Sequence, residues 1–370
     1  MYYLYYNEYA FRGDTYRQCA RGISSMNGVR RARIAPNGWW LRGLFILSLI
    51  VGAALGTRLG VAQQTAQKAA AAQAAKKDDK KGELQIPERR TLTLVTRDGV
   101  TLFVEYYPGG FVKRGEKVES LDGKRVVPLI LLHGWGGRGA DWAELAQALQ
   151  QYGYAVAVPD LRGHGRSTVM RTGGGTVTLD PERMNPREIT ALLNGMIEDV
   201  DTVKAHLLGL NNKAELNIEL LGVVGSEMGA LVAMNWAAFD WSKQSLPAFK
   251  QGKDVKLLVL LSPPESFRGL NNRPFINHPV SAQLFTMIAF GAGDRKAQQD
   301  AERLYRFLEK RHPQPSETLK YLPVETSLQG TQLLRRGLPV AEEMLRFLYA
   351  NLNQKVAAWP WMDRTIPLGQ

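Results

Sequence analysis

Hydrophobic positions along residues 86–355 alternate between two patterns. Short runs made up mostly of apolar residues are typical of strands that are covered on both faces. These runs are Val126–Leu132, Tyr154–Val158, Ile218–Val224 and Val255–Leu261. Between and after them, apolar residues recur at helical spacing, as in Pro186–Leu210 and in the closing segment Pro339–Leu352. Strands that alternate with helices predict an α/β fold, with a mostly parallel sheet and helices on both faces.

The segment Leu220–Ala230, LLGVVGSEMGA, predicts a sharp corner between a strand and a helix. Gly225 and Gly229 stand two residues before and two residues after Glu227. Backbone crowds these two positions when a side chain is presented at the tip of such a corner, so only residues with little or no Cβ bulk fit. A corner centred on Ser226 would put larger side chains at the crowded positions. The pattern therefore places Glu227 at the tip.

Three further loops follow predicted strands. They read His133-Gly134-Trp135, Asp160-Leu161-Arg162-Gly163-His164-Gly165-Arg166-Ser167 and Gly291-Ala292-Gly293-Asp294. With the corner at Glu227 in third place, their order resembles the α/β-hydrolase superfamily, close to its serine aminopeptidase and lysophospholipase-type members. The resemblance covers roughly residues 90–352 and implies the α/β-hydrolase fold. The segment between Pro263 and Leu284 is short, so we expect no large cap domain and an open pocket.

The resemblance implies a role for five residues. Glu227 stands at the nucleophile position, where a serine hydrolase carries its serine. The backbone N–H groups of Trp135 and Met228 would form the oxyanion hole. Asp294 stands at the position of the catalytic acid, although an aspartate there also suits a simple turn. Gln329, just before a Gly-Thr pair, stands where the family places its histidine.

These substitutions predict that serine-hydrolase activity is lost. A glutamine side chain donates and accepts hydrogen bonds but does not serve as a base near neutral pH. A glutamate could attack an alkyl carbon, but without a base the resulting ester would not be cleared. We also expect the carboxylate of Glu227 to accept the N–H groups of Trp135 and Met228.

The remaining histidines offer no obvious replacement for the missing base. His133 and His164 belong to turn motifs, and their side chains are expected to shape loops. His206 and His278 are expected to be structural or solvated, and His312 is expected at the surface.

Three hypotheses follow. In the first, the protein is a catalytically degenerate member of the fold that binds an unknown small molecule or protein, and Glu227 favours cationic or hydroxyl-bearing ligands. In the second, Glu227 acts as a general base with Asp294 nearby, in an enzyme of changed mechanism. In the third, an active hydrolase is retained, and the corner or the histidine loop has been placed wrongly. The sequence contains no metal-ligand spacing and no cofactor fingerprint.

The net charge of +12 does not indicate a nucleic-acid-binding face. Residues 1–62 carry +6, residues 63–84 carry +2, and the remaining 286 residues carry only +4. We therefore divide the chain into a leader (1–62), a low-complexity Ala/Gln/Lys linker (63–85), a globular domain (86–355) and a C-terminal tail (356–370).

The leader predicts export. Between Met26 and the apolar run Gly43–Gly56 lie four arginines, and this 14-residue run suits the core of a signal peptide, with cleavage after Ala62. The alternative is an uncleaved anchor through residues 39–58 that tethers the protein to a membrane. Either Met1 or Met26 could be the start. The only cysteine, Cys19, precedes the apolar run, so the exported part would contain no disulfide. The predicted location is periplasmic or extracellular, free or membrane-anchored.

Overall fold

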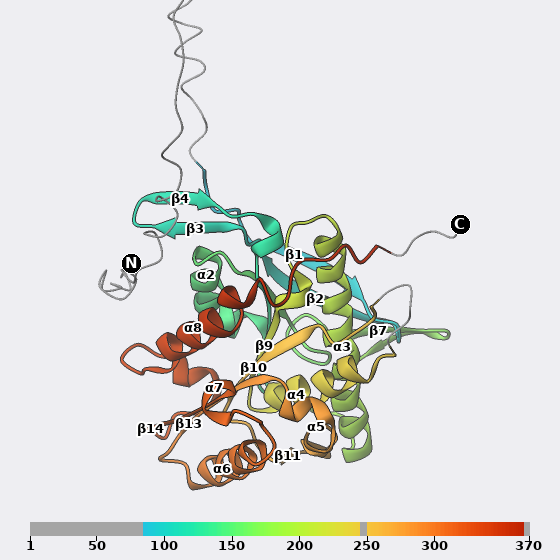
Figure 1. Ribbon diagram of the computed structural model, residues 1–370. Helices are drawn as coiled ribbons and strands as arrows, with labels where there is room; N and C mark the ends of the chain where they lie inside the picture. Colours follow the sequence, from blue (N-terminus) through green and yellow to red (C-terminus); the bar gives the residue numbers. More distant parts are fainter. Residues whose placement is uncertain (1–83, 245–249, 366–370) are drawn as a thin grey trace, which may run out of the picture. The chain divides into compact units, whose positions relative to one another are not determined.

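The computed structural model describes residues 84–244 and 250–365 (Figure 1). The predictions of a leader, a signal peptide or anchor, and a linker concern residues that lie almost wholly outside these ranges. Within the described ranges, no helix is long and apolar enough to cross a membrane.

In the described part of the chain, ten strands form one sheet in the order β14-β13-β10-β9-β5-β6-β2-β7-β8, with β1 also paired to β2. The strands are β1 Arg90–Val95, β2 Val100–Tyr107, β5 Pro128–Leu132, β6 Ala155–Pro159, β7 Val169–Thr172, β8 Gly175–Thr178, β9 Leu221–Ser226, β10 Val255–Leu261, β13 Phe285–Gly291 and β14 Leu319–Val324. From β14 to β6 neighbouring strands are parallel, and β2 joins antiparallel to β6. Strands β5, β6, β9 and β10 are buried along their whole length. The prediction of a mostly parallel, doubly covered sheet is confirmed.

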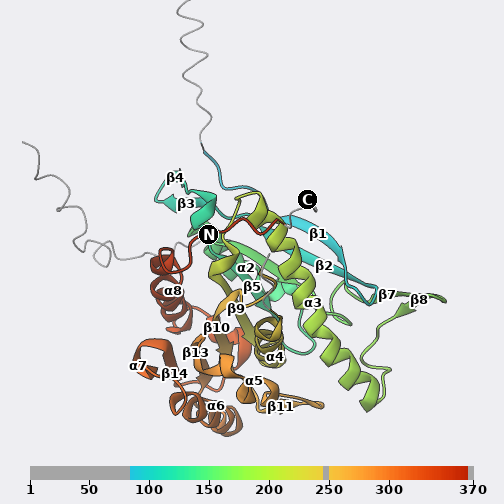
Figure 2. The same cartoon turned by 45° about the vertical axis from the view of Figure 1, so that its right-hand side comes forward.

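Helices cover both faces of this sheet (Figure 2). The helices are α2 Ala143–Gln151, α3 Pro186–Asn212, α4 Met228–Ser242, α5 Arg273–Asn277, α6 Arg295–Glu309, α7 Pro315–Thr318 and α8 Val340–Asn351. Buried residues of α3, α4 and α6 share one hydrophobic cluster with the sheet, and those of α2 and α8 share a second cluster on the other face.

The region after β10 is small. Residues 262–284 contain only the hairpin of β11 (Ser266–Phe267) and β12 (Leu270–Asn271), helix α5 and a 3-10 turn. A second hairpin, β3 (Phe111–Arg114) with β4 (Lys117–Ser120), lies outside the central sheet. The expectation that no large cap domain is present holds for the described residues.

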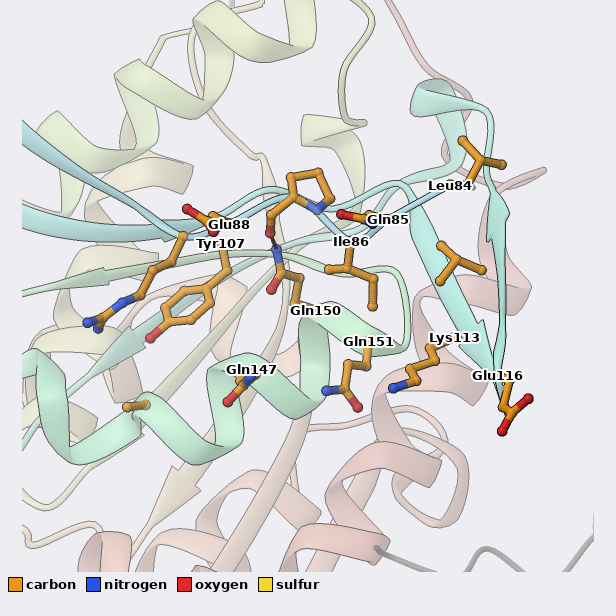
Figure 3. Close-up of a pocket in the computed structure, with 14 residues that line it drawn as sticks. Leu84, Gln85, Ile86, Glu88, Tyr107, Lys113, Glu116, Gln147, Gln150 and Gln151 are labelled. Carbon is orange, nitrogen blue, oxygen red and sulfur yellow. Dashed lines mark hydrogen bonds between the residues drawn. The ribbon is translucent and has the colours of Figure 1, made fainter. Parts of the chain in front are cut away.

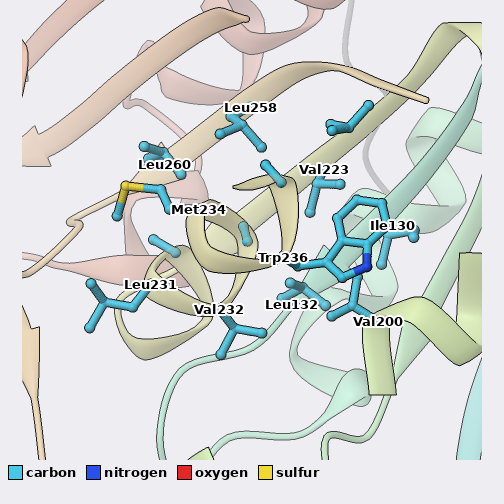
Figure 4. Close-up of a cluster of buried hydrophobic side chains, with 14 of the residues drawn as sticks. Ile130, Leu132, Val200, Val223, Leu231, Val232, Met234, Trp236, Leu258 and Leu260 are labelled. Atoms are coloured by element: carbon cyan, nitrogen blue, oxygen red, sulfur yellow. The ribbon is translucent and has the colours of Figure 1, made fainter. Parts of the chain in front are cut away.

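Helix α4 follows directly from the corner at Glu227 and is buried on nearly all sides. Its residues are apolar around the whole circumference, as expected of a helix enclosed by other elements. Figure 4 shows Trp236 of α4 among Ile130 and Val223 of the sheet and Val200 of α3. On another side of the helix, Met234 lies near Leu260 of β10. Trp236 of α4 is fully buried in this cluster. The corner therefore stands on a densely packed support.

Residues 356–365, part of the expected tail, lie along the edge of the sheet at which the parallel strands begin. The Trp361 indole donates to the carbonyl oxygen of Asn211 (3.0 Å), and the Asn217 amide donates to the carbonyl oxygen of Trp359 (3.0 Å). The segment ends with Arg364, whose guanidinium is buried. These contacts fasten residues 356–365 to α3 and to the start of β9.

A network of buried charges surrounds Arg364. Its guanidinium pairs with Glu219 and with Asp254, each at 2.8 Å. Lys204 lies 2.6 Å from Asp254, and Lys250 pairs with both Glu219 and Asp254. Burial alone would raise the pKa of Asp254, but the cations of Lys204, Lys250 and Arg364 outweigh it and hold that pKa well below its usual range. Charges at this edge of the sheet are mutually compensated.

Candidate functional site

The backbone at Glu227 has the strained geometry of a strand–helix corner. Its φ of 50° and ψ of −113° lie where residues with a Cβ are rarely found. Its N–H donates to the carbonyl oxygen of Leu261 (2.8 Å), which fixes the corner against the end of β10. Glu227 is thus presented at the tip, between the last residue of β9 and the first residue of α4.

The glycines on either side have no room for a side chain. A Cβ at Gly225 would lie 2.5 Å from the carbonyl oxygen of Gly229. A Cβ at Gly229 would lie 2.5 Å from the carbonyl oxygens of both Leu132 and His133. The crowding comes from backbone atoms, which cannot rotate away. The same contact presses the start of α4 against the loop that follows β5.

The Glu227 carboxyl group lies between two further glycines. A Cβ at Gly134 would be 2.7 Å from Glu227 Oε2, and a Cβ at Gly330 would be 2.8 Å from the same oxygen. The side chain remains exposed to solvent, yet neighbouring atoms remove part of its hydration, and this desolvation raises the pKa of the carboxyl group. No hydrogen bond or ion pair joins the carboxyl group to any other described residue.

The two N–H groups expected to form the oxyanion hole also have no acceptor in the described part of the chain. Met228 is the first residue of α4, so its N–H lies at the positive end of the helix dipole. Trp135 follows Gly134 in the adjoining loop and is half-buried. The expected hydrogen bonds from these N–H groups to the Glu227 carboxylate are not formed.

Gln329 does not face Glu227. Its Oε1 accepts the hydroxyl of Ser262 (2.5 Å), and its Nε2 donates to the carbonyl oxygen of Gly291 (3.0 Å). The Ser262 hydroxyl in turn accepts the N–H of Gly330 (3.0 Å). The glutamine therefore fastens its own loop to the ends of β10 and β13, and the residue that abuts the Glu227 carboxyl is Gly330.

Asp294 caps helix α6. Its Oδ1 accepts the backbone N–H groups of Lys296 (2.8 Å) and Ala297 (3.1 Å). No hydrogen bond joins it to Gln329 among the described residues. Glu227, Gln329 and Asp294 therefore gather at one end of the sheet without forming a hydrogen-bonded triad.

The two turn histidines are engaged within their loops. His133 Nε2 accepts the N–H of Leu161 (3.0 Å), and its Nδ1 donates to the carbonyl oxygen of Gly134 (2.7 Å). Burial lowers the pKa of His133 to about 4, so the ring is neutral at physiological pH. His164 Nδ1 lies 3.0 Å from the carbonyl oxygen of Arg162. Both rings shape the turns, as expected.

The other three histidines are also occupied elsewhere. The His206 ring lies edge-on to Tyr106, and His278 accepts the N–H of Val280 (3.1 Å). His312 was expected at the surface, and this was wrong: it is only 5% exposed, and its Nε2 lies 2.7 Å from the carbonyl oxygen of Ser281. All five histidines of the chain are described, and none is hydrogen-bonded to Glu227 or Asp294.

Sequence reasoning missed Ser262 and Gly330. Ser262 has a φ of 50°, directly after β10, and Gly330 has a φ of 56°. The position of Ser262 between a buried strand and two prolines was the available signal. Ser226, beside Glu227, is 1% exposed, and its hydroxyl has no hydrogen-bond partner in the described structure. A Cβ at Gly330 would lie 2.6 Å from that hydroxyl.

A separate groove of about 930 Å³ lies away from these residues (Figure 3). It is formed by residues 84–89, helix α2 and the β3–β4 hairpin. Three glutamines of α2 line it, and Gln150 closes one side by donating to the carbonyl oxygen of Pro87 (2.8 Å). None of the predicted site residues lines this groove.

Comparison with known proteins gives one family and several structures. A family model described as alpha/beta hydrolase fold matches residues 127–332. The fold is similar to an esterase from Pyrococcus furiosus (18% identity, TM-score 0.46, covering 74% of this chain and 91% of the other). It is also similar to an esterase from Pyrobaculum calidifontis (14% identity, TM-score 0.49, covering 74% and 86%). No curated protein sequence matches. At such identities nothing about activity passes from these esterases to this chain.

Proposed function

The chain belongs to the α/β-hydrolase fold family, and we propose that it has kept the family's pocket as a binding site while losing hydrolysis. The observation that carries the proposal is the isolation of Glu227. A carboxyl group stands at the tip of the corner, and no described base is in hydrogen-bond contact with it. The ligand would be a small molecule or a segment of a partner protein.

Loss of turnover follows from what the chemistry requires. Acyl transfer at such a corner needs a nucleophile and a neighbouring base that takes its proton and later activates water. A glutamate can attack only once if no base clears the product. Gln329 supplies an amide, and its hydrogen bonds to Ser262 and Gly291 hold it away from Glu227.

A retained binding role is supported by the strained corner and by the glycines around it. A strained backbone of this kind costs of order 1–3 kcal/mol and persists where the surroundings enforce it. Here Gly225, Gly229, Gly134 and Gly330 all leave the clearance that the corner and its carboxyl group need. The unpartnered N–H groups of Trp135 and Met228 remain available for a ligand.

A second candidate function is an enzyme in which Glu227 acts as a general base. The raised pKa of its carboxyl group favours this alternative, since a base works best near the pH of the reaction. Its weakness is the absence of a second catalytic group among the described residues, because Asp294 is occupied as a helix cap.

Ester hydrolysis by the wild-type protein and by Glu227→Ala separates the two candidates. We expect both to hydrolyse short-chain p-nitrophenyl esters at the same background rate, because Glu227 has no partner with which to complete a catalytic cycle. Asp294→Asn serves as the matched control for loss of a carboxylate at the same end of the sheet. A rate above background that Glu227→Ala removes would establish the enzyme.

We further propose that the protein acts outside the cytoplasm. The support is the arginine-flanked apolar run Gly43–Gly56 followed by small residues up to Ala62. Mass spectrometry of the mature chain tests this. An exported chain beginning at Gln63 supports cleavage, and a full-length chain recovered with membranes supports the anchor. A full-length chain in the cytoplasm contradicts both.

A further inference from the structure

Two aromatic rings and a guanidinium group meet beside the corner. The rings of Trp135 and Phe267 lie 5.4 Å apart at an angle of 49°. The guanidinium carbon of Arg268 lies 4.7 Å from the Trp135 ring centre and 5.5 Å from that of Phe267. Arginine stacks on aromatic faces through cation–π attraction and the planarity of its guanidinium. This ring pair therefore already holds a guanidinium, supplied by the protein itself.

The hairpin that carries Phe267 and Arg268 is fastened next to the corner. Strand β11 contacts helix α4, and the carbonyl oxygen of Asn271 in β12 accepts the Asn235 amide of α4 (2.9 Å). The turn itself has positive φ at Arg268 (44°) and Gly269 (92°), the geometry of a tight two-residue hairpin. Trp135 follows Gly134, the residue against which the Glu227 carboxyl lies. The ring pair and the carboxyl group therefore both lie at the loop that follows β5.

The charges of Arg268 and Glu227 are not matched by any described residue. Arg268 is exposed and has no carboxylate partner among the described residues, and Glu227 has no cation partner there. The two do not form an ion pair with each other. A buried hydroxyl without a partner in the described structure, that of Ser226, lies beside Glu227 against Gly330. A carboxylate without a cation partner, close to rings that bind cations, suits a ligand that brings its own positive charge.

We propose that the corner and this ring pair together recognise a guanidinium group, which pairs with the Glu227 carboxylate and stacks on Trp135 and Phe267 in place of Arg268. The inference rests on the proposed binding function and names the ligand class. Arg268 then acts as a placeholder that covers the rings in the free protein. A guanidinium fits better than a simple ammonium because its flat fork can donate to a carboxylate while its face lies on a ring.

The test is calorimetric titration of the purified protein with N-acetyl-argininamide and with N-acetyl-citrullinamide, in which a neutral urea replaces the guanidinium. We expect only the arginine compound to bind. Glu227→Gln should weaken its binding at least tenfold, because the ion pair is lost. Phe267→Leu should weaken it about two- to fivefold, the usual effect of one exposed cation–π contact. Arg268→Gln should tighten it at least threefold, because the competing cation is removed.

Matched control variants make the same kinds of substitution away from the corner. Arg311 lies 5.2 Å from the Phe307 ring, so Arg311→Gln removes a similar stack and should leave binding unchanged. Glu119→Gln on the β3–β4 hairpin removes a carboxylate outside the central sheet and should also leave binding unchanged. A glycine-flanked arginine peptide is titrated in parallel. Tighter binding of the peptide than of N-acetyl-argininamide indicates an arginine side chain of a protein as the ligand, and the reverse order indicates a small guanidine.

Two results would overturn the inference. One is equal binding, or no binding, of the arginine and citrulline compounds. The other is weaker binding to Arg268→Gln, which would make Arg268 part of the site. If neither compound binds and the wild type still fails to hydrolyse esters, the ligand class is wrong and the non-catalytic role stands. If the wild type does hydrolyse esters in a Glu227-dependent way, the proposed function is wrong.

Discussion

The two ends of strand β9 each carry a glutamate, and the surroundings of the two carboxylates differ completely. Glu219, just before the strand, is 5% exposed and pairs with Arg364 and Lys250. Glu227, just after it, has no partner in the described structure, on a backbone with a φ of 50°. Six residues of buried strand separate a fully compensated charge from an isolated one.

This difference separates the residues that stabilise the fold from the residues that are expected to bind a ligand. Sequences tend to satisfy local rules except at functional sites, where a strained or unpaired group is kept and compensated elsewhere. At the first end, α3, β10 and residues 356–365 contribute to one buried ion network. At the second end, a strained corner is joined by a carboxyl and two N–H groups that have no hydrogen-bond partner among the described residues. The second end is therefore where a ligand is expected.

The largest change in stability should come from disrupting the ion-pair network around Glu219, before strand β9. Arg364→Met removes a buried cation that pairs with both Glu219 and Asp254. Removing one partner from a buried ion pair typically destabilises by about 3–5 kcal/mol. Urea unfolding measures the free energy, with Arg306→Met, which loses only an exposed pair with Glu302, as the control. A change below about 1 kcal/mol, similar to that of the exposed pair, would mean that the network does not stabilise this end.

A smaller loss of stability should follow from adding a side chain at the crowded corner after strand β9. In Gly229→Ala the new Cβ meets two carbonyl oxygens of the loop after β5 at 2.5 Å, so backbone must move. Overpacking of this kind costs about 1–3 kcal/mol. A Cβ added at Gly209 in α3 would meet no neighbouring atom within 4 Å, so Gly209→Ala should instead stabilise by about 0.5–1 kcal/mol. Equal effects of the two substitutions would contradict the described crowding at the corner.

The smallest effect is a difference in how the carboxyl groups at the two ends of strand β9 make the free energy of unfolding depend on pH. Desolvation raises the pKa of Glu227 above 4.5, so above that pH the unfolded chain loses the proton first. Stability contributed by the protonated group is therefore lost as pH rises from 4.5 through the raised folded-state pKa. Asp254 has a depressed pKa, so its contribution is complete above pH 3.8 and is lost as pH falls below it.

Urea unfolding of the wild type and Glu227→Gln between pH 4 and 8 measures this difference. The wild type should lose stability relative to the variant as pH rises above 4.5, with no further divergence once the folded-state carboxyl is ionised. A wild type that gains stability relative to the variant over this range would show that Glu227 is paired after all.

The fold and the corner could be predicted because their causes are local. Short, mostly apolar runs predict buried parallel strands, and the spacing of Gly225 and Gly229 predicts which residue stands at the tip. The surroundings of the tip depend on contacts between distant segments. The side chain of Gln329 accepts a hydrogen bond from the hydroxyl of Ser262, 67 residues earlier. Nothing in the sequence of the Gln329 loop indicates this hydrogen bond.

Burial of polar groups was the other property that the sequence did not indicate. His312 is buried because its ring reaches the carbonyl oxygen of Ser281, 31 residues away. The segment 356–365 has no helical or strand periodicity, so it was predicted to be a tail. Its contacts come from single side chains, above all Trp361 and Arg364, that reach Asn211 and Glu219. Such isolated long-range contacts leave no repeating pattern.

Labelling with a fluorophosphonate probe tests the central claim most directly. Intact-mass spectrometry would compare the wild-type protein with the Glu227→Ser/Gln329→His double variant, with Gly330 retained. We predict no added mass on the wild type, because its corner presents a carboxyl and no base. The double variant should gain one label, because the glycine clearances and the N–H groups of Trp135 and Met228 are still in place. A labelled wild type would contradict the account, since some serine would then be an activated nucleophile.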